Sequence, residues 1–294
     1  MELGNHARGS ETEVVPTHVV GPIEEPDRDP VETAPGSKTG GVGDRAGSCD
    51  LGHCLTLRTQ GVKGNWKGGE LQGVVGVGWG MDLRLFRHVI WDWNGTLLDD
   101  AWLCREIMNG QLKRRGHPTI STERYEEVFD FPVEGYYRKV GFRWEKETFE
   151  QAGTEFIVEY EKRKRECRLQ IGAKNLLEKV EKAGLSQAVL SAYSHGSLEE
   201  FLEHFGVRGH FRTVAGSRDH YAEGKVEHGL KMLEELHVPA KEAVLVGDTT
   251  HDAEVAKAMG VACILIPCGH NSRDRLMRCG VKVVEGLGEL RIEA

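Results

Sequence analysis

The sequence lacks the features that mark membrane, secretory and nucleic-acid-binding proteins. No apolar run reaches the roughly 18 residues of a transmembrane helix. The N-terminus, MELGNHARGSETEVV, lacks the basic start and apolar core of a secretory signal. Basic residues are not in excess, because 38 Lys and Arg stand against 46 Asp and Glu in 294 residues, for a net charge of −8. These absences favour a soluble, cytoplasmic protein with neither nucleic acid nor a membrane as its partner.

The cysteines lack the pattern of a disulfide framework. There are seven, an odd number, and they are scattered along the chain, so we expect reduced thiols. Cys49 and Cys54 enclose His53, but no second pair follows at the spacing of a zinc site.

Residues 1–80 lack any helical or alternating period. They hold 17 of the 37 glycines and 5 of the 9 prolines, a composition that indicates a disordered leader. Patterned sequence begins at Met81, which is therefore a candidate for the true start of the protein.

After Met81 the sequence alternates strand and helix patterns. Six short apolar or β-branched runs predict strands over residues 88–93, 187–192, 211–216, 242–248, 262–267 and 281–286. Helical patterns separate the later runs, and two of them close on Gly206 and Gly260. This alternation predicts an α/β fold: a Rossmann-like parallel sheet with helices on both faces.

One long interval contains no convincing strand. Residues 99–185 carry helical patterns only, such as AWLCREIMNGQLKRRG and KETFEQAGTEFIVEYEKRKREC. We expect them to form an inserted helical cap above the strand ends. The catalytic core would then comprise residues 81–98 and 186–294.

Acidic residues follow two of the predicted strands. Asp92 ends HVIWD, and Asp248 ends VLVGD, with Asp252 one turn later. Ligands of an open α/β sheet bind at the carboxyl ends of its strands, so these acids should meet there. Their mutual repulsion calls for a cation, and Mg²⁺ suits carboxylates together with phosphate oxygens.

Two further residues complete a phosphate-binding pattern. Ser191 ends the strand pattern QAVLS and offers a hydroxyl donor, while Lys225 near the start of the next helix offers a cation. An acid nucleophile, a metal, a hydroxyl and a lysine together describe a phosphoryl-transfer site.

These four motifs resemble, in order, those of the haloacid dehalogenase superfamily of hydrolases. DWNGT matches the first motif, VLSA the second, Lys225 the third and GDTTHD the fourth. The resemblance covers about residues 85–294, and the helical insertion looks like the α-helical cap of the phosphoglycolate-phosphatase branch.

The resemblance implies roles for the motif residues. Asp92 would be the nucleophile that forms an aspartyl-phosphate. Asp92 and Asp248 would bind Mg²⁺ through their carboxylates and Asn94 through its backbone carbonyl, with Asp252 supporting the metal directly or through water.

The remaining motif residues would act on the phosphoryl group. Thr96, Ser191 and Lys225 would bind it or orient the nucleophile. In the cap, Arg138 is a candidate to read a substrate carboxylate or a second phosphate.

Asn94 departs from the pattern, since most phosphatases of the superfamily have an acid–base Asp there. An amide donates a hydrogen bond but cannot exchange a proton in this role. Three consequences stay open: slow phosphatase action, substrates whose leaving group needs little protonation, or proton transfer by another group such as His195 or His251. We expect Asn94 to slow dephosphorylation of the enzyme.

The sequence therefore predicts an enzyme, a Mg²⁺-dependent phosphatase that acts on a small phosphorylated metabolite. Phosphoglycolate is the natural candidate by resemblance. The alternatives are a phosphotransferase such as a sugar phosphomutase, and a metal- and phosphate-binding regulatory module that has lost turnover. A dehalogenase is less favoured, because halide displacement needs no metal-binding acids.

Overall fold

The computed structural model describes residues 65–67, 70–72, 80–217 and 224–292. The disorder predicted for residues 1–80 falls mostly outside these ranges, as do Cys49 and Cys54. Within the predicted leader, β1 (Asn65–Lys67) and β2 (Glu70–Gln72) pair as an antiparallel ladder.

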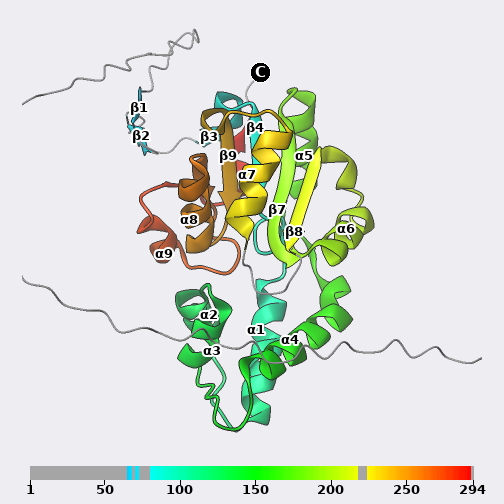
Figure 1. The fold of residues 1–294 in the computed structure, drawn as a ribbon, viewed down its shortest axis with the longest axis vertical. Coiled ribbons are helices and arrows are strands. Elements are labelled where there is room, and N and C mark those ends of the chain that lie inside the picture. The colour runs from blue at the N-terminus through cyan, green and yellow to red at the C-terminus, as the bar shows by residue number, and fades with distance from the viewer. Residues whose placement is uncertain (1–64, 68–69, 73–79, 218–223, 293–294) are drawn as a thin grey trace, which may run out of the picture. The chain divides into compact units, whose positions relative to one another are not determined.

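A six-stranded sheet forms the centre of the described chain (Figure 1). All neighbouring strands are parallel, in the order β11-β10-β9-β4-β7-β8. The strands are β4 (His88–Trp91), β7 (Ser186–Ser194), β8 (Thr213–Ser217), β9 (Ala243–Gly247), β10 (Ala262–Leu265) and β11 (Lys282–Val283). Each of the six predicted runs supplies one strand, so the predicted α/β, Rossmann-like fold is confirmed.

Helices cover both faces of this sheet. Successive side chains of a strand point to opposite faces, so each face packs against its own set of helices. In β4, Ile90 packs in a cluster with residues of α7 and α8, whereas Val89 and Trp91 pack in a cluster with residues of α5 and α6. The bounds of these helices are α5 (Ala173–Lys182), α6 (His195–His204), α7 (Lys225–Glu235) and α8 (Thr250–Met259).

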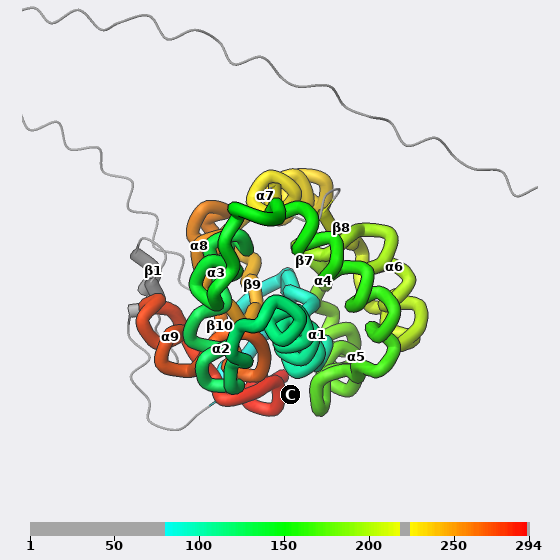
Figure 2. Tube along the Cα trace, turned by 90° about the horizontal axis from the view of Figure 1, so that it is seen from below, coloured from blue at the N-terminus to red at the C-terminus, as the bar shows by residue number. Residues whose placement is uncertain are grey.

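Four helices of the predicted cap lie beyond the carboxyl ends of the strands (Figures 1 and 2). They are α1 (Ala101–Arg114), α2 (Thr122–Val128), α3 (Val133–Lys139) and α4 (Phe149–Arg163). The next helix, α5, packs on the sheet although it falls within the predicted interval 99–185. The domain boundaries themselves stay predictions.

A two-residue ladder that the sequence did not predict joins the base of the insertion. β5 (Leu98–Asp99) pairs antiparallel with β6 (Arg168–Leu169). Two residues per strand are too few to show an alternating pattern. The ladder holds the start and the end of the four-helix insertion side by side.

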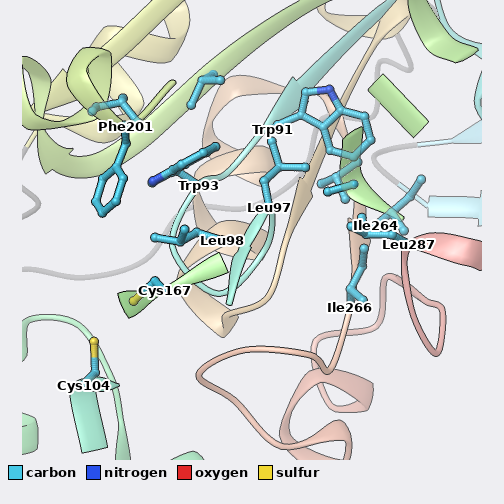
Figure 3. Packing of buried hydrophobic residues seen from close by; sticks show 14 of the residues in the cluster. Trp91, Trp93, Leu97, Leu98, Cys104, Cys167, Phe201, Ile264, Ile266 and Leu287 are labelled. Carbon is cyan, nitrogen blue, oxygen red and sulfur yellow. The ribbon is translucent and has the colours of Figure 1, made fainter. Parts of the chain in front are cut away.

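One apolar cluster continues from the sheet into the four-helix insertion. Trp91, Trp93 and Phe201 belong to it on the sheet side, and Cys104 of α1 belongs to it on the insertion side (Figure 3).

The remaining elements lie outside the six-stranded sheet. β3 (Met81–Asp82) pairs in parallel with β12 (Leu290–Arg291), and α9 spans Arg273–Met277. None of the helices in the described ranges is long and apolar enough to cross a membrane.

Candidate active site

The candidate site begins at a tight turn after the central strand β4. Asp92 follows that strand, and the turn continues through Asn94 to Gly95, whose φ is +80°. A Cβ atom on Gly95 would lie 2.2 Å from Oδ2 of Asp248. Glycine is therefore required here for both its conformation and its size.

Three carboxylates meet where β4 and β9 end. Asp92, Asp248 and Asp252 are all buried, and each offers an oxygen within 4.8 Å of the others. Lys225 lies between two of them, with its Nζ 2.6 Å from Oδ1 of Asp92 and 2.7 Å from Oδ1 of Asp252. The structure thus brings together four residues that the sequence predicted for the site, from strand ends and helix starts far apart in the chain.

The charges in this cluster do not balance, since three carboxylates share one ammonium group. Burial raises the pKa of Asp92 and of Asp248, and neighbouring carboxylates raise both further. Burial acts the same way on Asp252, but its ion pair with Lys225 lowers its pKa overall. Burial disfavours the charged form of Lys225, but Asp252 and Asp92 raise its pKa overall. A divalent cation would offset the excess negative charge, and oxygen ligands suit Mg²⁺.

Hydrogen bonds from the loop after β10 and from Thr96 hold Asp248 in place. The backbone N–H of His270 donates to Oδ2 of Asp248 at 2.6 Å, and the hydroxyl of Thr96 donates to Oδ1 at 2.9 Å. Thr96 also lies 3.3 Å from Oδ2 of Asp92. Its hydroxyl thus links two carboxylates, and Thr96 is not among the described residues that line the cavity.

Asp252 is fixed by the helix that carries it. Thr249 caps α8, and its hydroxyl donates to Oδ2 of Asp252 at 2.6 Å while accepting from the Asp252 backbone N–H at 3.3 Å. The carboxylate therefore caps the helix with one oxygen and binds Lys225 with the other.

Asn94, which stands where an acid–base Asp was expected, binds a buried acid that was not predicted from the sequence. Its Nδ2 donates to Oδ2 of Asp100 at 2.8 Å and to the hydroxyl of Tyr160 at 3.0 Å. Tyr160 in turn donates to the same oxygen of Asp100 at 2.7 Å, and the N–H of Gly95 donates to Oδ1 at 2.8 Å. Asp100 is fully buried. The only sequence signal for it was its place beside Asp99 at the start of the insertion.

A cavity of about 190 Å³ opens in front of Asp92. Polar residues around Asp92 line one end of it, namely Asp92, Asn94, Asp100, Ser191, Lys225, Thr249, Asp252 and His270. Side chains of α2, α3 and α4 and of the loop between α2 and α3 line most of the other end, and most of them are aromatic. Ser191 accepts from the N–H of Tyr193 at 3.1 Å and lies 3.4 Å from Oδ1 of Asn94.

The histidine that lines the cavity is not one of the histidines predicted for the site, and the predicted arginine does not line it. His270 lines the cavity, with its Nδ1 2.7 Å from the hydroxyl of Tyr125, although it was not among the predicted site residues. His195 and His251 are not among the described lining residues. Arg138 is exposed, pairs with Glu134 at 2.7 Å and is likewise outside that lining.

Comparisons with known proteins agree with this architecture. A solved haloacid dehalogenase-like hydrolase from Streptococcus pneumoniae has the same fold, with a TM-score of 0.62 at 16% identity over 70% of this chain and 97% of that one. The tyrosine-protein kinase PtkA of Mycobacterium tuberculosis is 27% identical over 198 residues, 67% of each chain. The phosphoglycolate phosphatase of Synechococcus elongatus is 24% identical over 64% of this chain and 87% of its own length.

The strongest assignment comes from the family level. A model of the family described as haloacid dehalogenase-like hydrolase matches residues 89–266, more than half of the sequence. The match begins just before Asp92 and extends beyond Asp252, so it includes all three carboxylates. The chain therefore belongs to the haloacid dehalogenase-like hydrolases.

Proposed function

We propose that this enzyme is a Mg²⁺-dependent phosphatase that hydrolyses a small phosphorylated metabolite. The observation that carries the proposal is the position of Asp92. Its carboxylate lines the cavity, pairs with Lys225, and has an oxygen within 4.8 Å of oxygens of Asp248 and Asp252. Phosphatases among the relatives support the same reaction class. The expected cytoplasmic location stays a prediction.

The reaction would run in two displacements at phosphorus. A carboxylate oxygen of Asp92 attacks the phosphorus, and the bond to the substrate oxygen breaks with its electron pair leaving on that oxygen. Water then attacks the phosphorus of the aspartyl-phosphate, which releases phosphate and restores Asp92. Dividing the reaction in this way replaces one difficult step by two easier ones.

The neighbouring residues would neutralise and orient these groups. Lys225 would offset negative charge at Asp92, and the hydroxyl of Ser191 faces the cavity as a donor to a phosphoryl oxygen. Thr96 would act on the carboxylates, which its hydroxyl already contacts, more than on the phosphoryl group.

The residues present fit a bound Mg²⁺. Asp92 and Asp248 would hold it through their carboxylates and Asn94 through its backbone carbonyl, with Asp252 acting directly or through water. Bound there, the ion would neutralise charge on the phosphoryl oxygens.

Phosphate release tests this proposal. The full-length protein should release phosphate from a panel of phosphomonoesters and acyl phosphates with Mg²⁺, and chelation should stop the release. Asp92→Asn should reduce the rate to background because the amide is not a nucleophile, while Asp99→Asn, at an exposed acid nearby, should not. Turnover that survives Asp92→Asn would contradict the aspartyl-phosphate route.

A phosphotransferase is the second candidate. Asn94 cannot take a proton from the attacking water. A phosphorylated Asp92 would therefore persist long enough for another acceptor to take the phosphoryl group. The similarity to a protein named as a tyrosine kinase also favours transfer. Product analysis with an added alcohol or sugar distinguishes the two: transfer yields a new phosphate ester, and hydrolysis yields free phosphate.

A further inference from the structure

The cavity in front of Asp92 is built to hold an apolar group. Its cap end is lined by the rings of Tyr125, Phe129, Phe131, Tyr136 and Phe156, and Tyr193 adds a ring from β7. Several of these rings contact one another, such as Tyr125 and Tyr136 with centroids 5.9 Å apart. A cavity of about 150 Å³ with an apolar lining holds benzene. The present cavity of about 190 Å³ therefore has room for one aromatic ring.

The same lining offers little to a charged substrate tail. Among the described lining residues, only Lys225 and His270 can carry a positive charge, and both lie at the end around Asp92. Lys225 is already paired with two carboxylates, and Nδ1 of His270 is engaged with Tyr125. A carboxylate placed among the rings would lose its hydration without gaining a cation, which is costly. This disfavours a small acidic substrate such as phosphoglycolate.

A second, independent observation concerns the leaving group. Asn94 has no acidic proton to give, and the neighbouring Asp100 is held as an acceptor by Asn94, Tyr160 and Gly95. The ring of His270 lies between the Tyr125 hydroxyl, 2.7 Å from its Nδ1, and Asp100, 3.7 Å from its Nε2. A phenol has a pKa of about 10, as in tyrosine. A phenolate therefore leaves without a proton far more readily than an aliphatic alkoxide.

We infer from these two observations that the substrate is the phosphate ester of a phenol, with its ring in the aromatic cavity. This inference rests on the proposed phosphatase function and names its substrate class. Asp92 attacks the phosphorus, the bond between phosphorus and the aryl oxygen breaks, and the electron pair leaves on the phenolate, which takes its proton from water afterwards. Water then releases phosphate from Asp92.

Three phosphate esters test the ring site and the leaving group separately. Phenyl and benzyl phosphate share a ring but differ in leaving group, whereas benzyl phosphate and phosphoglycolate both release an aliphatic alkoxide but differ in the tail. We compare kcat/KM, because it reports the steps up to phosphorylation of Asp92 and excludes the slow water step. The expected order is phenyl, then benzyl, then phosphoglycolate, with each step at least about tenfold.

A cavity-filling variant tests where the ring binds. Gly153 in α4 lines the cavity, and a Cβ atom there meets nothing within 4 Å, so Gly153→Leu fills the cavity with no clash at Cβ and adds a better helix former. It should lower kcat/KM for phenyl and benzyl phosphate at least about tenfold relative to phosphoglycolate. Gly135→Leu is the matched control, because Gly135 lies in the cap helix α3 with equal space but outside the cavity lining.

Binding of inert analogues tests the same site without turnover. Phenylphosphonate should bind at least about tenfold more tightly than methylphosphonate, and Gly153→Leu should remove the difference. Free phosphotyrosine and a phosphotyrosyl peptide carry the same phenolic ester, so the better of the two identifies a small molecule or a protein as its source.

The outcomes separate the substrate from the reaction. Phosphoglycolate as the best ester, equal rates for phenyl and benzyl phosphate, or equal binding of the two phosphonates would overturn the phenolic assignment while leaving the phosphatase intact. No phosphate from any ester would instead contradict the proposed function, and the phosphonates would still test the ring site.

Discussion

The contact between Asn94 and Asp100 explains why an amide is stable at position 94. Asn94→Asp would replace the donor that lies 2.8 Å from the buried Asp100 carboxylate by a second negative charge. We expect the free energy of unfolding to fall by about 2 kcal/mol, as measured by urea denaturation. Adding Asp100→Asn should restore most of this loss, because an amide at position 100 would then donate to the new carboxylate.

The same pair of substitutions tests the chemistry of position 94. The double variant places a proton-exchanging group at residue 94, so steady-state phosphate release should rise about 100-fold or more over wild type. Asp99→Asn serves as the control for Asp100→Asn, since Asp99 is an exposed neighbour. An Asn94→Asp protein as stable as wild type would refute the role of Asp100.

At the scale of elements, the start of α8 joins helix capping to the site. Thr249→Ala removes the hydroxyl that caps the helix and holds Asp252. We expect a loss of about 1 kcal/mol in the free energy of unfolding together with weaker Mg²⁺ binding by calorimetry. Thr249→Ser should preserve both properties.

A second capping box provides the control for this prediction. Thr148 caps α4 through the same reciprocal bonds with Gln151, and neither residue is among those described as lining the cavity. Thr148→Ala should cost a similar free energy of unfolding while leaving Mg²⁺ affinity unchanged. If Thr249→Ala binds Mg²⁺ as tightly as wild type, Thr249 does not position Asp252.

At the scale of the whole molecule, metal binding should stabilise the fold. The three carboxylates come from separate parts of the chain and meet only when it is folded, so Mg²⁺ should bind the folded state. At a concentration of about 100 times Kd, this adds about 2.7 kcal/mol and raises Tm. Thermal melts with Mg²⁺ and with chelator measure the effect, and an equal rise in Asp248→Asn would exclude this site as its source.

The buried His88 should make stability depend on pH. Burial, assisted by the positive charge of Arg212, lowers its pKa from 6.5 to about 4, and neither ring nitrogen has a hydrogen-bond partner. Below pH 6.5 the unfolded chain takes up a proton that the folded protein does not, so stability falls as pH drops from 6.5 towards 4. His88 contributes about 3 kcal/mol of this loss.

Urea denaturation at pH 7 and pH 4.5 measures this loss. His88→Leu places a nonionisable, apolar side chain of similar size in β4. This variant should lose less stability between the two pH values than wild type. Equal losses in the two proteins would show that His88 does not take up the proton.

Local patterns were sufficient to predict the sheet and the acids at its edge. A strand buried on both faces reads as an apolar run wherever it lies in the fold, so the strands β4, β7 and β9 were visible one by one. Asp92 and Asp248 were predictable for the same reason, because each directly follows such a run. The ladder of β5 and β6 was not, since its residues carry no pattern without their partner.

The sequence by itself therefore determined the fold class, the family and the acids that follow the strands, because short-range periodicity and motif spacing encode them. Only the tertiary structure decided the surroundings of Asn94. Tyr160 lies 66 residues away in the sequence, and its contact with Asn94 exists because α4 crosses the strand ends. The aromatic cavity has the same origin: rings from three helices and from the loop between α2 and α3 converge by packing. No local pattern distinguishes a ring that lines a cavity from one that fills a core.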